Sequence, residues 1–215
     1  MSKPWLGPVL LAAMAVFALA VYPSLPEHVP THWGLSGEAD DWMPKWPGAF
    51  LPVFLGAGVW VLLLVLRRID PRRVHYESFR DTFWLLLNVL IAFFALIQVV
   101  SLGTALGWPI DASRVILLAV GLLFVAFGSY LPRVRSNWWI GIRTPWTLES
   151  ERVWRETHRL AGATFTLGGL VTLAAALLPP DLRPWVATAG LILAAFVPAV
   201  YSYLVYRRER RERHA

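Results

Sequence analysis

The sequence contains no cysteine, and only 16% of its 215 residues are charged, whereas a typical soluble domain has about 25%. The lack of cysteine excludes disulfide frameworks, thiolate zinc sites and cysteine nucleophiles. Hydrophobic residues make up 57% of the chain, which a soluble globule of this length could not bury and a disordered chain would not contain. The composition therefore predicts an integral membrane protein.

Six stretches are long and apolar enough to cross about 30 Å of hydrocarbon, which takes about 20 helical residues. They are residues 5–22, 48–66, 82–107, 112–131, 160–179 and 184–206. Charged residues and prolines separate them, and tryptophans stand near many of their ends, as is typical of the headgroup region. We expect an all-α integral membrane protein with six transmembrane helices.

Lysine and arginine are divided unevenly between the two sides of this arrangement. The side that holds both termini and the 67–81 and 132–159 connections carries 17 of the 20. Since such an excess stays in the cytoplasm, both termini are predicted to be cytoplasmic and the 23–47 loop to lie outside. Topology accounts for the net charge of +6, so no direct nucleic-acid binding is expected. The first stretch imitates a secretory signal with small residues around Ala18, but its length favours an uncleaved helix.

Two connections are longer and more patterned than a link between helices requires. The outer loop, 23–47, contains five prolines, which prevent a continuous helix and favour a compact irregular cap. The inner loop, 132–159, is irregular at first and then places Val153, Trp154 and Thr157 on one helical face. This periodicity predicts an interfacial helix that leads into the fifth span.

Motifs in both loops resemble the SdpI family. In the inner region they are Gly128-Ser129-Tyr130-Leu131-Pro132-Arg133-Val134-Arg135, Asn137, Gly141-Ile142-Arg143-Thr144-Pro145-Trp146-Thr147-Leu148, Trp154 and His158-Arg159. The outer run Leu25-Pro26-Glu27-His28-Val29-Pro30-Thr31-His32-Trp33, with Gly37-Glu38, is similar to the small domain that precedes many SdpI regions. The resemblance implies a multi-pass protein of the bacterial cytoplasmic membrane that confers immunity to a secreted peptide toxin and holds a cognate transcriptional repressor at the membrane.

The same resemblance suggests how the chain is organised. Residues 1–66 would form an N-terminal two-helix region and residues 67–81 a cytoplasmic linker. Residues 82–215 would form an SdpI-like four-helix membrane region with a basic tail.

The residues in these motifs suggest a binding site. Arg143 offers a planar guanidinium suited to a carboxylate or a lipid phosphate. The candidate ligand- or partner-binding residues are Asn137, Arg143, Thr144, Trp146, Thr147, Trp154 and His158 in the inner loop, and His32 and Trp33 in the outer loop. In the alternative interpretation, Arg143 pins the loop through backbone carbonyls, the tryptophans anchor it in the interface, and His158 hydrogen-bonds within the bundle.

A metal site is conceivable at His28 and His32, which have i,i+4 spacing among acidic neighbours. Pro30 lies between them and breaks the helical geometry on which that spacing depends. We therefore expect no metal and no cofactor.

Within the spans, polar and small residues indicate helix packing. Asn88 and Gln98 are expected to hydrogen-bond between helices, and the absence of deeply placed charges argues against an ion-coupled pump. Two small-residue stripes are expected to be packing seams: Ala161, Thr164, Gly168, Thr172 and Ala175 in the fifth span, and Gly190 with Ala194 in the sixth.

Three function classes remain open. The first is an immunity and signalling protein whose partners are membrane lipids, a peptide toxin and a cytoplasmic repressor, the last docking on the basic face of 132–159 and 207–213. The second is a transporter of a small molecule or peptide, built from inverted three-helix halves. The third, a membrane-embedded enzyme, is weakest because no nucleophile and base motif is recognisable, so we expect no catalytic residue.

Overall fold

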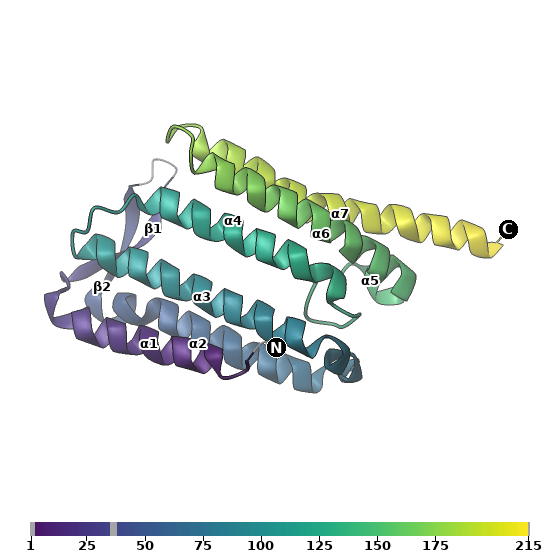
Figure 1. The fold of residues 1–215 in the computed structure, drawn as a ribbon, viewed down its shortest axis with the longest axis horizontal. Helices are drawn as coiled ribbons and strands as arrows, with labels where there is room; N and C mark the ends of the chain where they lie inside the picture. The colour runs from purple at the N-terminus through teal and green to yellow at the C-terminus, as the bar shows by residue number, and fades with distance from the viewer. Residues whose placement is uncertain (1–2, 35–37, 215) are drawn as a thin grey trace.

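The structure is a computed structural model that describes residues 3–34 and 38–214. Long helices run alternately up and down one bundle (Figure 1): α1 (Leu6–Val21), α2 (Lys45–Ile69), α3 (Arg80–Ala105), α4 (Ala112–Tyr130), α6 (Glu151–Ala175) and α7 (Arg183–His214). A short helix, α5 (Pro145–Glu149), and the 3-10 helices η1 (Tyr22–Ser24), η2 (Arg73–Phe79) and η3 (Leu131–Arg133) connect them. The N- and C-terminal ends of the chain both lie toward the end of the bundle where α5 lies.

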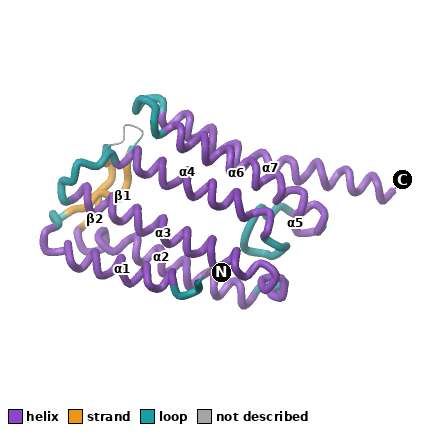
Figure 2. Tube along the Cα trace, in the orientation of Figure 1, coloured by secondary structure: helices purple, strands orange, loops and turns teal. Residues whose placement is uncertain are grey.

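Five of the predicted spans coincide with helices that are long and apolar enough to cross a membrane: α1, α2, α3, α4 and α7. α6 runs alongside them but does not meet this criterion (Figure 2). Its first turns are charged, its apolar part contains several glycines and threonines, and it ends at Ala175 rather than at residue 179. The fifth predicted span, residues 160–179, therefore stays a prediction.

The helix that was predicted to lead from the 132–159 loop into the fifth span is present, and its interfacial position stays a prediction. Residues 151–159 form the first turns of α6 itself, which continues unbroken to Ala175. Ser150 begins this helix because its hydroxyl accepts a hydrogen bond from the Val153 amide (3.3 Å). The separate helix of the loop is the five-residue α5.

The outer loop is not irregular, so the protein is not wholly α-helical. Strands β1 (His28–Trp33) and β2 (Ala39–Pro44) form an antiparallel hairpin with His28 opposite Pro44. Its prolines exclude a helix but suit a two-stranded sheet, because Pro44 ends β2 and Pro30 lies beside a break in the register. The hairpin lies at the end of the bundle opposite α5 (Figure 2), where the Ser101 hydroxyl of α3 donates to the Pro30 carbonyl (2.6 Å).

Helices α1, α2 and α3 pack through large side chains. The main buried cluster contains Met14, Tyr76, Phe79, Phe83, Leu86, Leu87, Ile91, Val134 and Trp154. Asn88 and Gln98 of α3 make the expected cross-bonds. Asn88 donates to the Lys3 carbonyl before α1 (3.0 Å), and Gln98 donates to the Ala49 carbonyl in α2 (3.1 Å).

Helices α4, α6 and α7 instead approach through small residues. A Cβ on Gly168 of α6 would lie 2.3 Å from the Gly190 carbonyl oxygen and 3.1 Å from the Ala194 Cβ, so the two predicted stripes pack against each other. A second seam, which the sequence did not reveal, joins another face of α6 to α4. There a Cβ on Gly169 would lie 2.7 Å from the Gly121 carbonyl oxygen.

Candidate functional site

Asn137 is the centre of the inner loop, and its side chain is fully buried. Its amide nitrogen donates to the carbonyls of Arg135 (2.8 Å) and Ile140 (3.0 Å). Its amide oxygen accepts from the backbone N–H groups of Trp139 (2.8 Å) and Ile140 (2.7 Å), and the Tyr76 hydroxyl oxygen lies 3.2 Å from it. The protein thus satisfies both ends of this amide, and Asn137 shapes the loop.

Asp70 ties this loop to the connection between α2 and α3. Its carboxylate is 2% exposed and accepts from the Tyr76 hydroxyl (3.0 Å), the Trp138 amide (3.0 Å) and the Arg72 amide (2.7 Å). We refer to Asp70, Tyr76 and Asn137 with these bonded neighbours as the inner junction. A buried carboxylate requires such donors, but in the sequence Asp70 is only one of the charged residues that separate the spans.

Residues 67–81, expected to be a linker, are a packed part of the structure. Tyr76 and Phe79 of η2 are buried. Arg72 donates to the Ser136 hydroxyl and to the Leu148 carbonyl (2.6 Å), and the His75 Nδ1 lies 2.6 Å from the Ser136 carbonyl oxygen. The two inner connections therefore fold as one unit.

His158 and Trp154 lie on consecutive turns of α6, with their rings stacked 4.1 Å apart. The His158 Nε2 accepts from the Ile142 amide (3.0 Å), while Nδ1 bonds the Trp154 carbonyl (2.9 Å). This pairing requires the neutral ring with its proton on Nδ1, and burial lowers the pKa of His158 to about 4. His158 precedes the predicted span. Its two hydrogen bonds agree with the alternative interpretation of the sequence, in which His158 bonds within the bundle rather than to a ligand.

Gly141 makes room for this histidine. Its φ of +110° is rare for residues with a side chain, and a Cβ there would lie 2.3 Å from the His158 Nε2. The glycine of the sequence motif therefore serves the close approach of loop and helix.

Thr144 and Thr147 form the cap of α5. The Thr144 hydroxyl accepts from the Thr147 amide (3.2 Å), and the Thr147 hydroxyl accepts from the Thr144 amide (2.9 Å). The Thr144 hydroxyl also lies 3.0 Å from that of Ser202, and Trp146 packs on Tyr203 at 4.9 Å. This part of the motif therefore fastens the loop to α7.

Arg143 differs from these residues because it is exposed. One guanidinium nitrogen donates to the Trp138 carbonyl (3.2 Å), and the structure gives the others no partner among the described residues. This bond agrees in part with the interpretation that Arg143 pins the loop through backbone carbonyls. The remaining N–H donors of the exposed guanidinium stay available to a ligand or partner.

His32 and Trp33 do not join the other candidates. Both lie on β1, at the hairpin end of the bundle, whereas the seven inner residues lie at the α5 end (Figure 1). The exposed His32 Nδ1 is 2.5 Å from an Asp40 carboxylate oxygen. Across residues 3–34 and 38–214, no group of three or more metal-ligand side chains is found.

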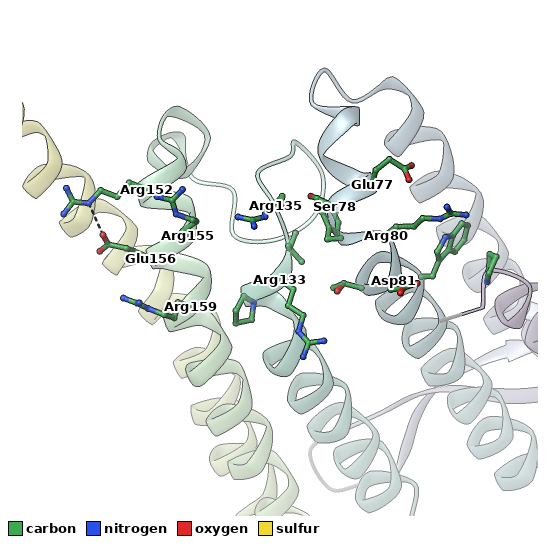
Figure 3. Close-up of a pocket in the computed structure, with 16 residues that line it drawn as sticks. Glu77, Ser78, Arg80, Asp81, Arg133, Arg135, Arg152, Arg155, Glu156 and Arg159 are labelled. Carbon is green, nitrogen blue, oxygen red and sulfur yellow. Dashed lines mark hydrogen bonds and ion pairs between the residues drawn. The ribbon is translucent and has the colours of Figure 1, made fainter. Parts of the chain in front are cut away.

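A cavity of about 1250 Å³ opens beside the inner junction, between the start of α3, η3 and the start of α6 (Figure 3). Six arginines line it: Arg80, Arg133, Arg135, Arg152, Arg155 and Arg159. We call it the arginine cavity. The sequence did not reveal it, because these residues come from segments that only the fold brings together.

The tail is also part of this end of the molecule. α7 continues past the predicted span to His214, and the Glu209 carboxylate accepts from the Ser150 hydroxyl (2.6 Å). The Ser150 hydroxyl and the Arg213 guanidinium lower the pKa of Glu209. Arg152 bonds Glu212 (2.5 Å). The basic tail is thus packed on the start of α6.

Long apolar helices with an arginine-rich end define this chain as a multi-pass helical membrane protein. Residues 133–202 match the SdpI/YfhL protein family, and residues 9–57 match a domain of unknown function, DUF1648. The chain is 21% identical to the Immunity protein SdpI of Bacillus subtilis (strain 168) over 208 residues, which cover 97% of this chain and 98% of that protein. These matches confirm the resemblance to the SdpI family. No solved structure matches the chain.

Proposed function

We propose that this protein is a bacterial membrane immunity protein of the SdpI type, which protects the cell from a secreted peptide toxin. The observation that carries the proposal is the match to an immunity protein across almost the full length of both chains. The motif residues are consistent with it, because they hold the inner loop in one shape and leave Arg143 exposed, with one guanidinium nitrogen bonded to the Trp138 carbonyl and the others available to a partner.

Expression in a toxin-sensitive bacterium tests the proposal. The protein should restore growth in the presence of the toxin, without turnover or transport of the peptide. A protein that inserts into the membrane in normal amounts and gives no protection against the peptide toxins tested would contradict it.

Arg143→Lys tests whether the exposed guanidinium takes part. The substitution keeps the charge but loses the planar fork, so protection should fall sharply while membrane abundance stays near wild type. Arg73→Lys is a matched control, since Arg73 is also exposed. A fall in abundance would make Arg143 structural, and unchanged protection in both Arg143→Lys and Arg143→Gln would remove it from the site.

We infer that both termini face the cytoplasm. The uneven distribution of lysine and arginine supports this, as does the position of both chain ends at the arginine-rich end of the bundle (Figure 1). Reporters fused after Ala215 or inserted within 67–81 should report cytoplasm, and one near Asp40 should report the outside. A cytoplasmic reporter near Asp40 would overturn the scheme.

A cytoplasmic repressor, if recruited, would dock on the basic face of 132–159 and 207–213, which carries eleven arginines against five glutamates. Truncation after Tyr206 is a poor test, because it also removes the Glu209 and Glu212 contacts with α6. Replacing Arg207, Arg208 and Arg211 by Gln retains both glutamates. Lost recruitment with normal abundance would support a docking tail, and full recruitment would leave only the 132–159 loop.

Transport is the second candidate function. α1, α2 and α3 pack together, as do α4, α6 and α7, which is the grouping expected of two three-helix halves (Figure 1). Uptake or efflux of the labelled toxin by proteoliposomes would favour transport, whereas binding without flux would favour immunity by recognition.

A further inference from the structure

Four arginines of the arginine cavity have no partner among the residues that the structure describes. Arg80 begins α3, Arg135 follows η3, and Arg155 and Arg159 lie one turn apart on α6. All four are exposed, and none of their guanidinium groups forms a hydrogen bond or ion pair with residues 3–34 and 38–214. Figure 3 shows Arg135 between Arg155 on α6 and Arg80 on α3.

The acidic residues of the cavity do not balance this charge. Three line it, against six arginines. Glu77 is engaged by Arg67 (2.8 Å), and Glu156 is engaged by Arg152 (3.0 Å). Like charges that converge on one hollow repel one another, so an anion bound between them would stabilise the arrangement.

The position of the cavity indicates where that anion comes from. Its lining lies where the neighbouring segments change from polar to apolar: Pro4 just before α1, Thr82 near the start of α3, Pro132 just after α4 and Arg159 before Leu160. This is the level of lipid headgroups in a membrane. The rings of Phe79 and Trp84 add apolar lining beside the charges.

We propose that the arginine cavity binds the phosphate headgroup of an anionic phospholipid. Guanidinium forks suit phosphate oxygens, which accept two parallel hydrogen bonds from each fork. The acyl chains would continue along the apolar surfaces of the helices that lead away from the cavity. The site is independent of toxin recognition, so it stands or falls separately from the proposed immunity function.

The test is thermal unfolding of the full-length protein, purified and delipidated in a zwitterionic detergent, with added short-chain phosphatidylglycerol. Phosphatidylglycerol should raise the Tm of the wild type, whereas phosphatidylcholine and inorganic phosphate at equal concentration should not. Replacing Arg135, Arg155 and Arg159 by Gln should weaken the apparent affinity by about tenfold or more, since one hydrogen bond to a charged group already contributes about that much.

A control triple variant replaces Arg73, Arg208 and Arg211 by Gln. It removes the same charge from exposed arginines outside the cavity and should respond to phosphatidylglycerol as the wild type does. Equal losses in both triples would overturn the proposal in favour of unspecific attraction. Arg155→Lys, which keeps the charge and disturbs folding least, should lose part of the response, and a full response in both Arg155→Lys and the cavity triple would also overturn it.

The remaining outcomes identify a different occupant. An equal rise in Tm with inorganic phosphate would mean that the cavity binds free phosphate rather than a lipid. An equal rise in Tm with a poly-glutamate peptide would mean that the cavity binds an acidic protein segment. No response of the wild type to phosphatidylglycerol would refute the site.

Discussion

The first three helices and the last three of this bundle pack in different ways. α1, α2 and α3 surround large side chains such as Phe83 and Ile91, which are almost fully buried. α4, α6 and α7 approach so closely that glycine carbonyls and side chains occupy the space where a Cβ would lie. Both kinds of packing gain van der Waals contacts in a membrane. Large side chains fill the space between α1, α2 and α3, whereas small residues let α4, α6 and α7 approach until little space is left. The two regions should therefore fail under opposite substitutions.

Removing a large side chain should have its largest effect in the first region. Phe83→Ala deletes a ring that is 1% exposed and contacts Tyr76 and Trp84, so we expect a loss of about 3–5 kcal/mol. Phe124→Ala removes a partly exposed ring that stacks on Phe165 in the second region and should cost less than half of that. Unfolding of purified protein measures both, and equal losses would contradict the contrast.

The tie between the inner loop and α6 should respond to pH. His158 must be neutral to make its two hydrogen bonds. Its pKa in the folded state is about 4, below the usual value of about 6.5. The contribution of His158 to the free energy of unfolding is therefore present above pH 6.5 and is lost as the pH falls toward 4. Wild type should lose about 2–3 kcal/mol more than His158→Gln between pH 7 and pH 4. Parallel pH profiles of the two proteins would show that the histidine does not titrate in this range.

Adding a single methyl group should have its effect in the second region. Gly168→Ala puts a Cβ against the Gly190 carbonyl and should destabilise the protein by about 1–3 kcal/mol. Gly58→Ala in α2 is the matched control, because nothing lies within 4 Å of its Cβ position. There the better helix propensity of alanine should stabilise by up to about 1 kcal/mol. A gain at Gly168 would mean that the seam is loose.

The helix contacts that the sequence predicted are marked by regular spacing or by a polar residue in an apolar segment. The stripes around Gly168 and Gly190 follow helical spacing, and Asn88 and Gln98 stand out as polar residues in apolar surroundings. The seam between α4 and α6 was missed although it also follows helical spacing, with Gly121 and Gly128 in α4 opposite Gly169 and Gly162 in α6. The hairpin was missed because Pro30 and the acidic start of β2 disguise its strands.

The inner end of the molecule was the hardest part to predict. Asn137, Thr147 and His158 were singled out as candidate ligand- or partner-binding residues, and the structure gives all three partners in the protein backbone. A sequence does not distinguish these two roles, because the same side chain can hydrogen-bond a ligand or the backbone. Asp70 was overlooked because its donors are contributed by the fold, among them the amide of Trp138, 68 residues further along the chain. The arginine cavity depends on the same long-range proximity.

α7 has one further consequence. Its 32 residues form one continuous helix through Pro198, about 48 Å long at 1.5 Å per residue, whereas the hydrocarbon layer is about 30 Å thick. The last turns of α7 therefore extend beyond the hydrocarbon layer as a rigid continuation of the span. Any rotation of the span about its axis also rotates these water-accessible residues. A spin label or fluorophore placed at Arg211 would report that rotation without touching the bilayer.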